Sequence, residues 1–192
     1  MFALYTSIDS DVPSSLKFGG YDESAVAPGE NLTWLHTKEN DSWGLAAKFM
    51  IVFDETVRME GNDPRVILIE PQMPYMYLPK AEFKHFAENL KNVYEDIKCK
   101  ATFCYFEKSC ENVNEPDEEK IRIQIFSPGT GDDFELKISL ERLLVKNFDP
   151  KATQEDLDMC YLGVFPQNEG RQDVWYLGNL ILAEYYLVFD MD

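Results

Sequence analysis

The pattern of hydrophobic and polar positions predicts a protein built mostly from β-strands. Short apolar or alternating runs are bounded by Gly, Pro, Asn and Asp, which is typical of strands joined by turns. The 13 Phe and 10 Tyr agree with this prediction, because aromatic side chains pack well on a pleated sheet. The predicted strands are Phe2–Ile8, Leu16–Gly20, Leu32–His36, Trp43–Phe53, Val66–Ile69, Thr102–Phe106, Ile121–Phe126, Phe134–Ile138, Cys160–Phe165, Trp175–Gly178 and Tyr185–Asp190.

One long segment has a helical period instead. Across Lys80–Ile97 the apolar side chains recur at helical spacing and form one stripe, and Pro79 stands before them at a suitable helix start. We expect this stripe to pack on the core and not to bind a partner. One further helical turn is expected at Asn179–Glu184. The stripe consists of Phe83, Phe86, Ala87, Leu90, Val93, Tyr94 and Ile97.

No repeat, low-complexity tract or change of composition marks a boundary between domains. With 192 residues, 45% of them hydrophobic, the chain is long enough for one domain with a substantial core. We therefore interpret residues 1–192 as a single domain, mostly β, with one long helix.

The chain is strongly acidic, with 35 Asp and Glu against 18 Lys and Arg and a net charge of −17. Such a surface repels phosphate backbones, so no nucleic-acid partner is expected. The charge suits either a protein that works at low pH or one that self-repulsion keeps in solution. Residues 1–8 lack the basic region of a signal peptide, and no apolar run is long enough to span a membrane.

The first candidate for chemistry is Glu70, which directly follows the apolar strand Val66–Ile69 and precedes a turn that contains Pro71 and Pro74. A carboxylate at the exit of a buried strand is partly desolvated, an environment in which catalytic acids and bases are often found. The alternative is that Glu70 simply faces solvent at the end of the strand.

Other reactive groups give little indication of catalysis, metal binding or a cofactor. His36 and His85 stand at no recognisable spacing from a nucleophile, and the four Cys contain no Cys-x-x-Cys unit, so no metal is expected. Ser127–Gly131 resembles a phosphate-binding loop but lacks the following Lys, so no cofactor is expected. Two triplets that begin at Asn31 and Asn40 fit the N-glycosylation acceptor pattern.

Several separated stretches carry a resemblance when they are taken together and in order. They are Phe2–Tyr5, Leu16–Asp22, Leu32–Trp34, Trp43, Val66–Pro79, Trp175–Asn179 and Tyr185–Asp190. The Phe-Gly-Gly-x-Asp element and the Trp-x-Leu-Gly element with its closing Phe-Asp are the more specific parts. From end to end, the chain resembles the C-terminal lobe of pepsin-like aspartic peptidases.

This resemblance implies a β-rich fold that forms one half of a two-lobed enzyme. In the family each lobe supplies one Asp from an Asp-Thr-Gly turn, and the two Asp share a proton and activate the water that attacks the peptide carbonyl. The present chain resembles the second lobe only, and the first lobe is not in the sequence. The resemblance therefore implies peptide-bond hydrolysis only where an N-terminal lobe completes the site.

The expected catalytic turn departs from the family pattern. Glu70 stands in place of the Asp, and its extra methylene displaces the carboxylate beyond the tolerance of a catalytic pair. Pro71 replaces the Thr that clamps the two turns, and Gln72 carries a Cβ where Gly lets two backbones approach. Met73 removes a further hydroxyl, and Asn179 stands where the family has a later Asp. We expect this chain alone to be inactive; the alternative function is that of a non-enzymatic pseudo-peptidase, a protein-binding or structural module.

The resemblance also implies a disulfide, a partner surface and a location. Cys160 is expected to pair with Cys104 or Cys110. Phe2–Ile8 and Tyr185–Asp190 are expected in a sheet that joins both lobes, where an apolar face would bind the missing N-terminal lobe, a second copy or another protein. A peptide or protein ligand is also compatible with the family. If the chain belongs to a longer one, the expected location is the secretory pathway, a lysosome-like compartment or the extracellular space.

Overall fold

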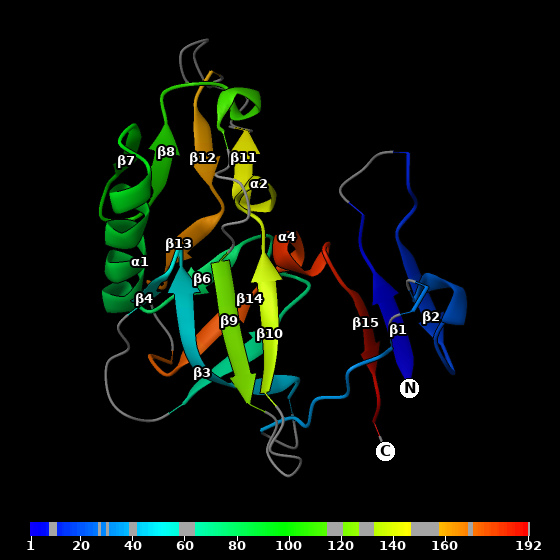
Figure 1. Ribbon diagram of the computed structural model, residues 1–192. Helices are drawn as coiled ribbons and strands as arrows, with labels where there is room; N and C mark the ends of the chain where they lie inside the picture. The colour runs from blue at the N-terminus through cyan, green and yellow to red at the C-terminus, as the bar shows by residue number, and fades with distance from the viewer. Residues whose placement is uncertain are drawn as a thin grey trace.

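The structure is a computed structural model that describes residues 1–7, 11–26, 28–29, 31–38, 42–57, 64–114, 121–126, 133–146, 158–168 and 171–191. Its described strands form three sheets, and one long helix lies beside them (Figure 1). The prediction of a mostly β fold with one long helix is confirmed.

The largest sheet has eight strands, and its longest strand, β3, is an interior one with three partners. The order is β10-β9-β3-β5-β14-β6-β13, and β4 also pairs with β3. β5 and β14 run parallel to each other, whereas β3 is antiparallel to both β5 and β9. The bounds are β3 (Gly44–Val52), β4 (Glu55–Val57), β5 (Arg65–Ile69), β6 (Met76–Leu78), β9 (Ile121–Phe126), β10 (Asp133–Ile138), β13 (Val164–Pro166) and β14 (Val174–Leu177).

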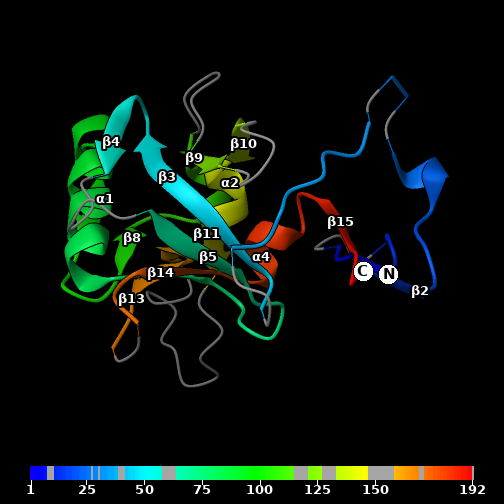
Figure 2. The same ribbon diagram turned by 90° about the horizontal axis from the view of Figure 1, so that it is seen from below.

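Two smaller sheets complete the described strands. A four-stranded sheet has the order β11-β12-β8-β7. A three-stranded sheet, β15-β1-β2, lies to one side of the main body and pairs the first described strand with the last one (Figures 1 and 2). The bounds are β1 (Phe2–Tyr5), β2 (Ser15–Phe18), β7 (Ile97–Cys99), β8 (Cys104–Phe106), β11 (Leu144–Lys146), β12 (Cys160–Leu162) and β15 (Tyr186–Phe189).

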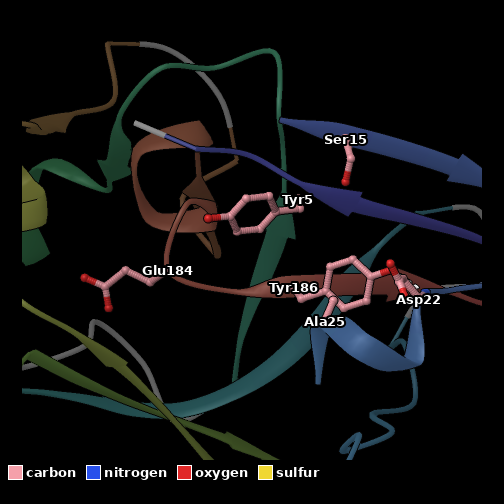
Figure 3. A pocket seen from close by; sticks show the side chains of 6 residues that line it. All are labelled: Tyr5, Ser15, Asp22, Ala25, Glu184 and Tyr186. Carbon is pink, nitrogen blue, oxygen red and sulfur yellow. Dashed lines mark hydrogen bonds between the residues drawn. The ribbon is translucent and has the colours of Figure 1, made fainter. Parts of the chain in front are cut away.

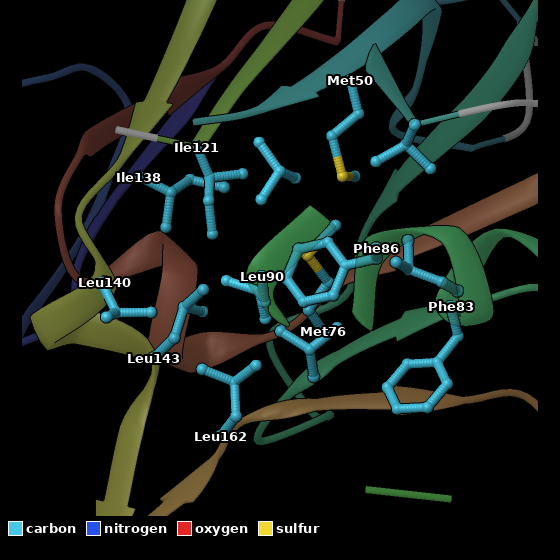
Figure 4. Packing of buried hydrophobic residues seen from close by; sticks show 14 of the residues in the cluster. Met50, Met76, Phe83, Phe86, Leu90, Ile121, Ile138, Leu140, Leu143 and Leu162 are labelled. Atoms are coloured by element: carbon cyan, nitrogen blue, oxygen red, sulfur yellow. The ribbon is translucent and has the colours of Figure 1, made fainter. Parts of the chain in front are cut away.

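Helix α1 (Lys80–Val93) covers one end of the main sheet and packs against β3, β4, β7 and β13. Phe86 and Leu90 on its buried face meet Met50 of β3 and Ile121 of β9 in the core (Figure 4). The predicted apolar stripe is therefore a core contact. The remaining helical elements are short: η1 (Glu23–Ala25), η2 (Cys110–Asn112), α2 (Leu140–Leu143) and α4 (Asn179–Leu182).

The predicted end of the long helix was wrong. α1 ends at Val93, Tyr94 has an extended backbone, and Ile97 is already the first residue of β7. Tyr94 and Ile97 are both buried in the same core as the helix. Their spacing continued the apolar stripe by coincidence, because a strand that packs on the same core supplies apolar residues of its own.

Other differences from the prediction concern short or irregular segments. Leu32–His36 belongs to no sheet, and Trp34 within it is 49% exposed, so its apolar residues do not share one buried face. The predicted strand Cys160–Phe165 is divided at Gly163, and its two halves join different sheets. A Cβ on Gly163 would lie 2.6 Å from Leu180 Cδ2, so this crossing point has no room for a side chain. The segments β4, β6, β7 and β11 have three residues each, too few to produce a periodic signal.

A buried charged cluster connects three elements of the fold. Glu82 lies in the first turn of α1 and is fully buried. Its Oε1 accepts hydrogen bonds from Nε of Arg65, at 2.7 Å, and from the Nη2 group of the same residue at the start of β5. Its Oε2 accepts the indole N–H of Trp175 in β14. Because α1, β5 and β14 each provide one member, the cluster sets the position of the helix on the two parallel strands.

Two disulfides stabilise the four-stranded sheet, one within its β7–β8 hairpin and one between β12 and the η2 segment. Cys110 bonds with Cys160, which is one of the two pairings that the family resemblance implied. Cys104 bonds instead with Cys99, the residue directly opposite it in the β7–β8 hairpin. Among the described residues, no cysteine is free.

We expect the substitution Glu82→Gln to lower the free energy of unfolding by about 3 kcal/mol, because it removes the carboxylate charge that pairs with the buried guanidinium of Arg65. Urea denaturation measures this loss. The matched control is Glu88→Gln on the same helix, whose carboxylate is 49% exposed and pairs loosely with Lys84, and which should change stability by less than about 0.5 kcal/mol. Equal losses for the two variants would contradict a structural role for the cluster.

The two disulfides should differ in their effect on stability. In the chain-entropy model, removal of the Cys110–Cys160 bond, which spans 50 residues, costs about 4 kcal/mol, and removal of the Cys99–Cys104 bond, which spans 5, costs about 2 kcal/mol. The test compares the urea unfolding of the two double Cys→Ser variants. Non-reducing peptide mapping of the unmodified chain is its control, and a mapping that found other pairs would refute the assignment.

Candidate functional site

The predicted site residue Glu70 lies at the exit of β5, where its side chain is partly exposed. The following turn is closed by a hydrogen bond from Met73 N to Glu70 O, at 3.0 Å. The backbone N–H of Glu70 donates to Leu177 O at the end of β14, also at 3.0 Å. The turn is therefore attached to the parallel neighbour of its own strand.

A second turn, which follows β14, packs directly on the first. Asn179 N donates to Met73 O at 2.7 Å, and Leu180 N donates to Pro74 O at 3.1 Å. A Cβ on Gly178 would collide with the carbonyl oxygens of Met73 and Tyr75. The Gly in this position is thus required by the close approach of two backbones that are far apart in the sequence.

The chemistry that these two turns offer is limited to one carboxylate. Within Glu70–Met73 only Glu70 carries an acid, and Asn179 supplies an amide to the second turn where the resemblance led us to expect an Asp. A general acid–base pair of the aspartic type needs two neighbouring carboxylates that share a proton. The two turns by themselves do not supply such a pair.

An aromatic hollow follows the first turn along the chain. It has a volume of about 250 Å³ and is lined by Tyr75, Tyr77, Thr102, Phe165, Pro166 and Asn168. The ring centroid of Phe165 lies 5.0 Å from that of Tyr75 and 6.1 Å from that of Tyr77. Burial raises the pKa of the Tyr77 hydroxyl, and the nearby Tyr75 raises it further. The sequence analysis missed this hollow; the two Tyr spaced two residues apart were its available signal, but the pairing of β6 with β13 was needed to bring Phe165 to them.

The other predicted site residues lie apart from these turns. Asn31 is exposed, as an acceptor of glycosylation must be, whereas Asn40 lies outside the described residues. His85 stands on α1 with Nδ1 at 3.3 Å from Glu88 Oε2, at the surface of the helix. Cys104, Cys110 and Cys160 are all in disulfides.

Metal and membrane sites were also sought across the described ranges. No three His, Cys, Asp or Glu side chains there come close enough together to hold a metal ion. No helix in that part of the chain combines the length and the apolar character that crossing a membrane requires.

The three-stranded sheet presents one apolar face. Because directly paired residues of antiparallel strands project to the same side, the register gathers six apolar side chains on that face. They are Phe2, Leu4, Leu16, Phe18, Leu187 and Phe189. The Trp43 ring covers part of the face, with its centroid 5.9 Å from Phe2 and 4.9 Å from Phe189. Phe18 is 76% exposed and Leu16 55% exposed, so the other part is open.

The sequence analysis placed the first and the last strand in one sheet but did not assign Ser15–Phe18 to it. It could not tell which residues of the last strand share a face with Phe2 and Leu4. The register selects Leu187 and Phe189, while Tyr186 and Val188 project to the opposite side. We call the six-residue set defined above the apolar sheet face.

The solved structure of basic 7S globulin from soybean superimposes with a TM-score of 0.68 at 16% sequence identity, and the match covers 96% of this chain and 48% of that chain. The chain therefore shares its fold and spans about half the length of that protein. A comparison with curated protein sequences finds no match.

The family comparison covers the whole chain. The model of the eukaryotic aspartyl protease family matches residues 1–192. This match includes both turns, the apolar sheet face and the long helix. The chain belongs to the eukaryotic aspartyl protease family.

Proposed function

We propose that residues 1–192 form one domain that acts as the C-terminal lobe of a two-lobed, pepsin-like protein, and that this lobe is catalytically inactive alone. The proportions of the match to basic 7S globulin support this proposal, since nearly all of this chain corresponds to about half of that one. The open apolar sheet face supports it as well, because large exposed apolar patches mark interfaces.

The observation that carries the proposal is the pair of turns at Glu70–Met73 and Gly178–Asn179. Their backbones are held together by the hydrogen bond from Asn179 N to Met73 O. This close packing of two turns supports the proposal of a half-site, while Pro71 and Gln72 replace the Thr and Gly that its chemistry needs. In this proposal hydrolysis of a peptide bond depends on an N-terminal lobe that supplies the first Asp, and Glu70 is a displaced and poor substitute for the second.

The second candidate function is that of a non-enzymatic pseudo-peptidase that binds proteins or peptides. The aromatic hollow beside the first turn favours it. The rings of Tyr75, Tyr77 and Phe165 offer an apolar surface with hydroxyl groups at its edge, which suits an extended peptide with a bulky side chain. This function needs no acid–base pair, so the altered turn does not oppose it.

The proposed location is an oxidising compartment: the secretory pathway, a lysosome-like organelle or the extracellular space. Two disulfides are the support, because such bonds form and persist where thiols are not kept reduced. The exposure of Asn31 is compatible with a glycan there, and Asn40 is proposed from its triplet alone.

The chain alone should not hydrolyse a broad acid-protease peptide substrate between about pH 3 and 7, because one turn cannot supply two coupled carboxylates. Glu70→Asp should not restore activity, since Pro71 and Gln72 remain. The measurement is product formation by mass spectrometry against a buffer blank. Hydrolysis that Glu70→Gln abolishes, and that the surface substitution Glu88→Gln leaves intact, would overturn the proposed inactivity.

The apolar sheet face should drive association of the isolated chain. In the absence of the first lobe, a second copy related by two-fold symmetry is the simplest closed arrangement. Light scattering over a range of concentrations should give a mass that rises towards a dimer. The double variant Leu16→Ser, Phe18→Ser should weaken association at least about tenfold, because it removes two open apolar side chains from the contact.

The control for this experiment lies between the two substituted residues. Lys17 pairs with Ala3 and therefore projects to the other side of the same strand. The variant Lys17→Ser should associate as the unmodified chain does. A mass that stays monomeric at every concentration would exclude the apolar sheet face as the contact. Equal weakening of association by the double variant and by Lys17→Ser would exclude it as well.

A further inference from the structure

The opposite side of the three-stranded sheet contains a second hollow, with a volume of about 380 Å³ (Figure 3). Its floor is a row of three paired residues, because Tyr5 of β1 lies opposite Tyr186 of β15 and also opposite Ser15 of β2. Asp22 and Ala25 from the η1 segment form one wall, and Glu184 stands at the other end. The hollow is separate from the two turns and from the apolar sheet face.

The wall at Asp22 is held in place by neighbouring polar groups. Oδ1 of Asp22 accepts hydrogen bonds from Ser24 N at 3.0 Å and from Ser24 Oγ at 2.8 Å. The side-chain bond from Ser24, followed by its backbone bond, holds the pKa of the Asp22 carboxyl below its usual range. The backbone N–H of Asp22 donates to the Tyr186 hydroxyl at 2.7 Å. The carboxylate and the Tyr186 ring are thus fixed relative to each other.

The opposite end is fixed from the main body of the protein. Oε1 of Glu184 accepts a hydrogen bond from Ser139 Oγ at 2.6 Å and lies 3.6 Å from Arg142 Nε. In Figure 3 the Tyr5 hydroxyl points to the side of the hollow on which Glu184 stands, whereas the Tyr186 hydroxyl points to Asp22. Each carboxylate therefore stands beyond the hydroxyl end of one Tyr ring.

The charge of the lining favours a cation. Two of the six lining residues are acids and none is basic. Arg142 lies beside Glu184, and Lys17, whose Nζ donates to the carbonyl of Tyr21 at 2.9 Å, also acts on Asp22 by its charge but, in the part of the chain that the structure describes, forms no salt bridge with it. Asp22 is therefore the lining acid that is open to a cationic ligand. The net charge of −17 for the whole chain further raises the local concentration of positive ligands.

We propose that this hollow binds a protonated alkylamine. The ammonium group pairs with the carboxylate of Asp22 and is attracted by the face of Tyr186, while the alkyl stem packs along the two Tyr rings. The volume is in the range of small-ligand sites and far exceeds that of a single water molecule. This inference stands independently of the proposed function, because it uses neither the turns nor the apolar sheet face.

The same chemistry has two sources, a free amine and the side chain of a lysine in a partner protein. The experiment separates them with two pairs of probes on ¹⁵N-labelled 192-residue chain at pH 7. The first pair is n-butylammonium and the neutral n-butanol, and the second is acetyl-lysine amide and acetyl-norleucine amide. The readout is the shift of the backbone amide signals of Tyr5, Ser15, Asp22 and Ala25 during titration.

We expect saturable shifts of these signals with the two charged probes and none with their neutral counterparts. Added salt should weaken the binding. Tighter binding of acetyl-lysine amide than of n-butylammonium identifies the lysine side chain as the source, and the reverse identifies a free amine. Equal shifts with charged and neutral probes, or no saturable shift with any probe, would overturn the proposal.

The variant Asp22→Asn tests the role of the carboxylate without loss of the fold, because Asn also serves as the cap of η1. It should weaken n-butylammonium binding about threefold or more. Tyr5→Leu, which removes one ring from the floor, should weaken it as well. The matched control is Asp190→Asn, an exposed acid just after β15, which removes the same charge away from the hollow. Equal effects of Asp22→Asn and Asp190→Asn would mean that the net charge of the chain alone attracts the probe, and this result would refute the site.

Discussion

The buried carboxylate of Glu82 is the interaction on which the arrangement of the elements most depends. It binds Arg65 at the start of β5 and Trp175 in β14. A carboxylate at that depth is tolerated only where charged and hydrogen-bonding partners meet it, so the helix and the two strands share one relative position. The two turns follow these same two strands. The same buried cluster therefore constrains both the position of α1 and the position of the candidate site.

The turns themselves keep their geometry through the backbone. The contacts that join them are made by backbone N–H and C=O groups of Glu70, Met73, Leu177 and Asn179. The two backbones can approach this closely because Gly178 has no side chain. None of these contacts needs the hydroxyl or the carboxylate that hydrolysis requires. The geometry of the two turns therefore does not depend on the side chains, such as that of Pro71, that differ from the family pattern.

Much of the fold could be predicted from the sequence because most strands are long enough to show a pattern. The position of Glu70 was found in the same way, from the apolar run before it. The segments that were missed, such as Met76–Leu78, have only three residues, and the error at Ile97 arose where a strand extended a helical stripe. The aromatic hollow, the Arg65–Glu82–Trp175 cluster and the Cys99–Cys104 bond depend on which strands pair across the chain, which periodicity alone does not give.

The pairing of β1 with β15 has a consequence for the order of folding. All four residues of β1 pair with β2, which follows closely in the sequence, and also with β15, which follows far later. Contacts between such distant segments require the closure of a very long loop and form late. During synthesis, one edge of Phe2–Tyr5 can pair early with β2, whereas its other edge stays open to chaperones and to other nascent chains until Tyr186–Phe189 has emerged.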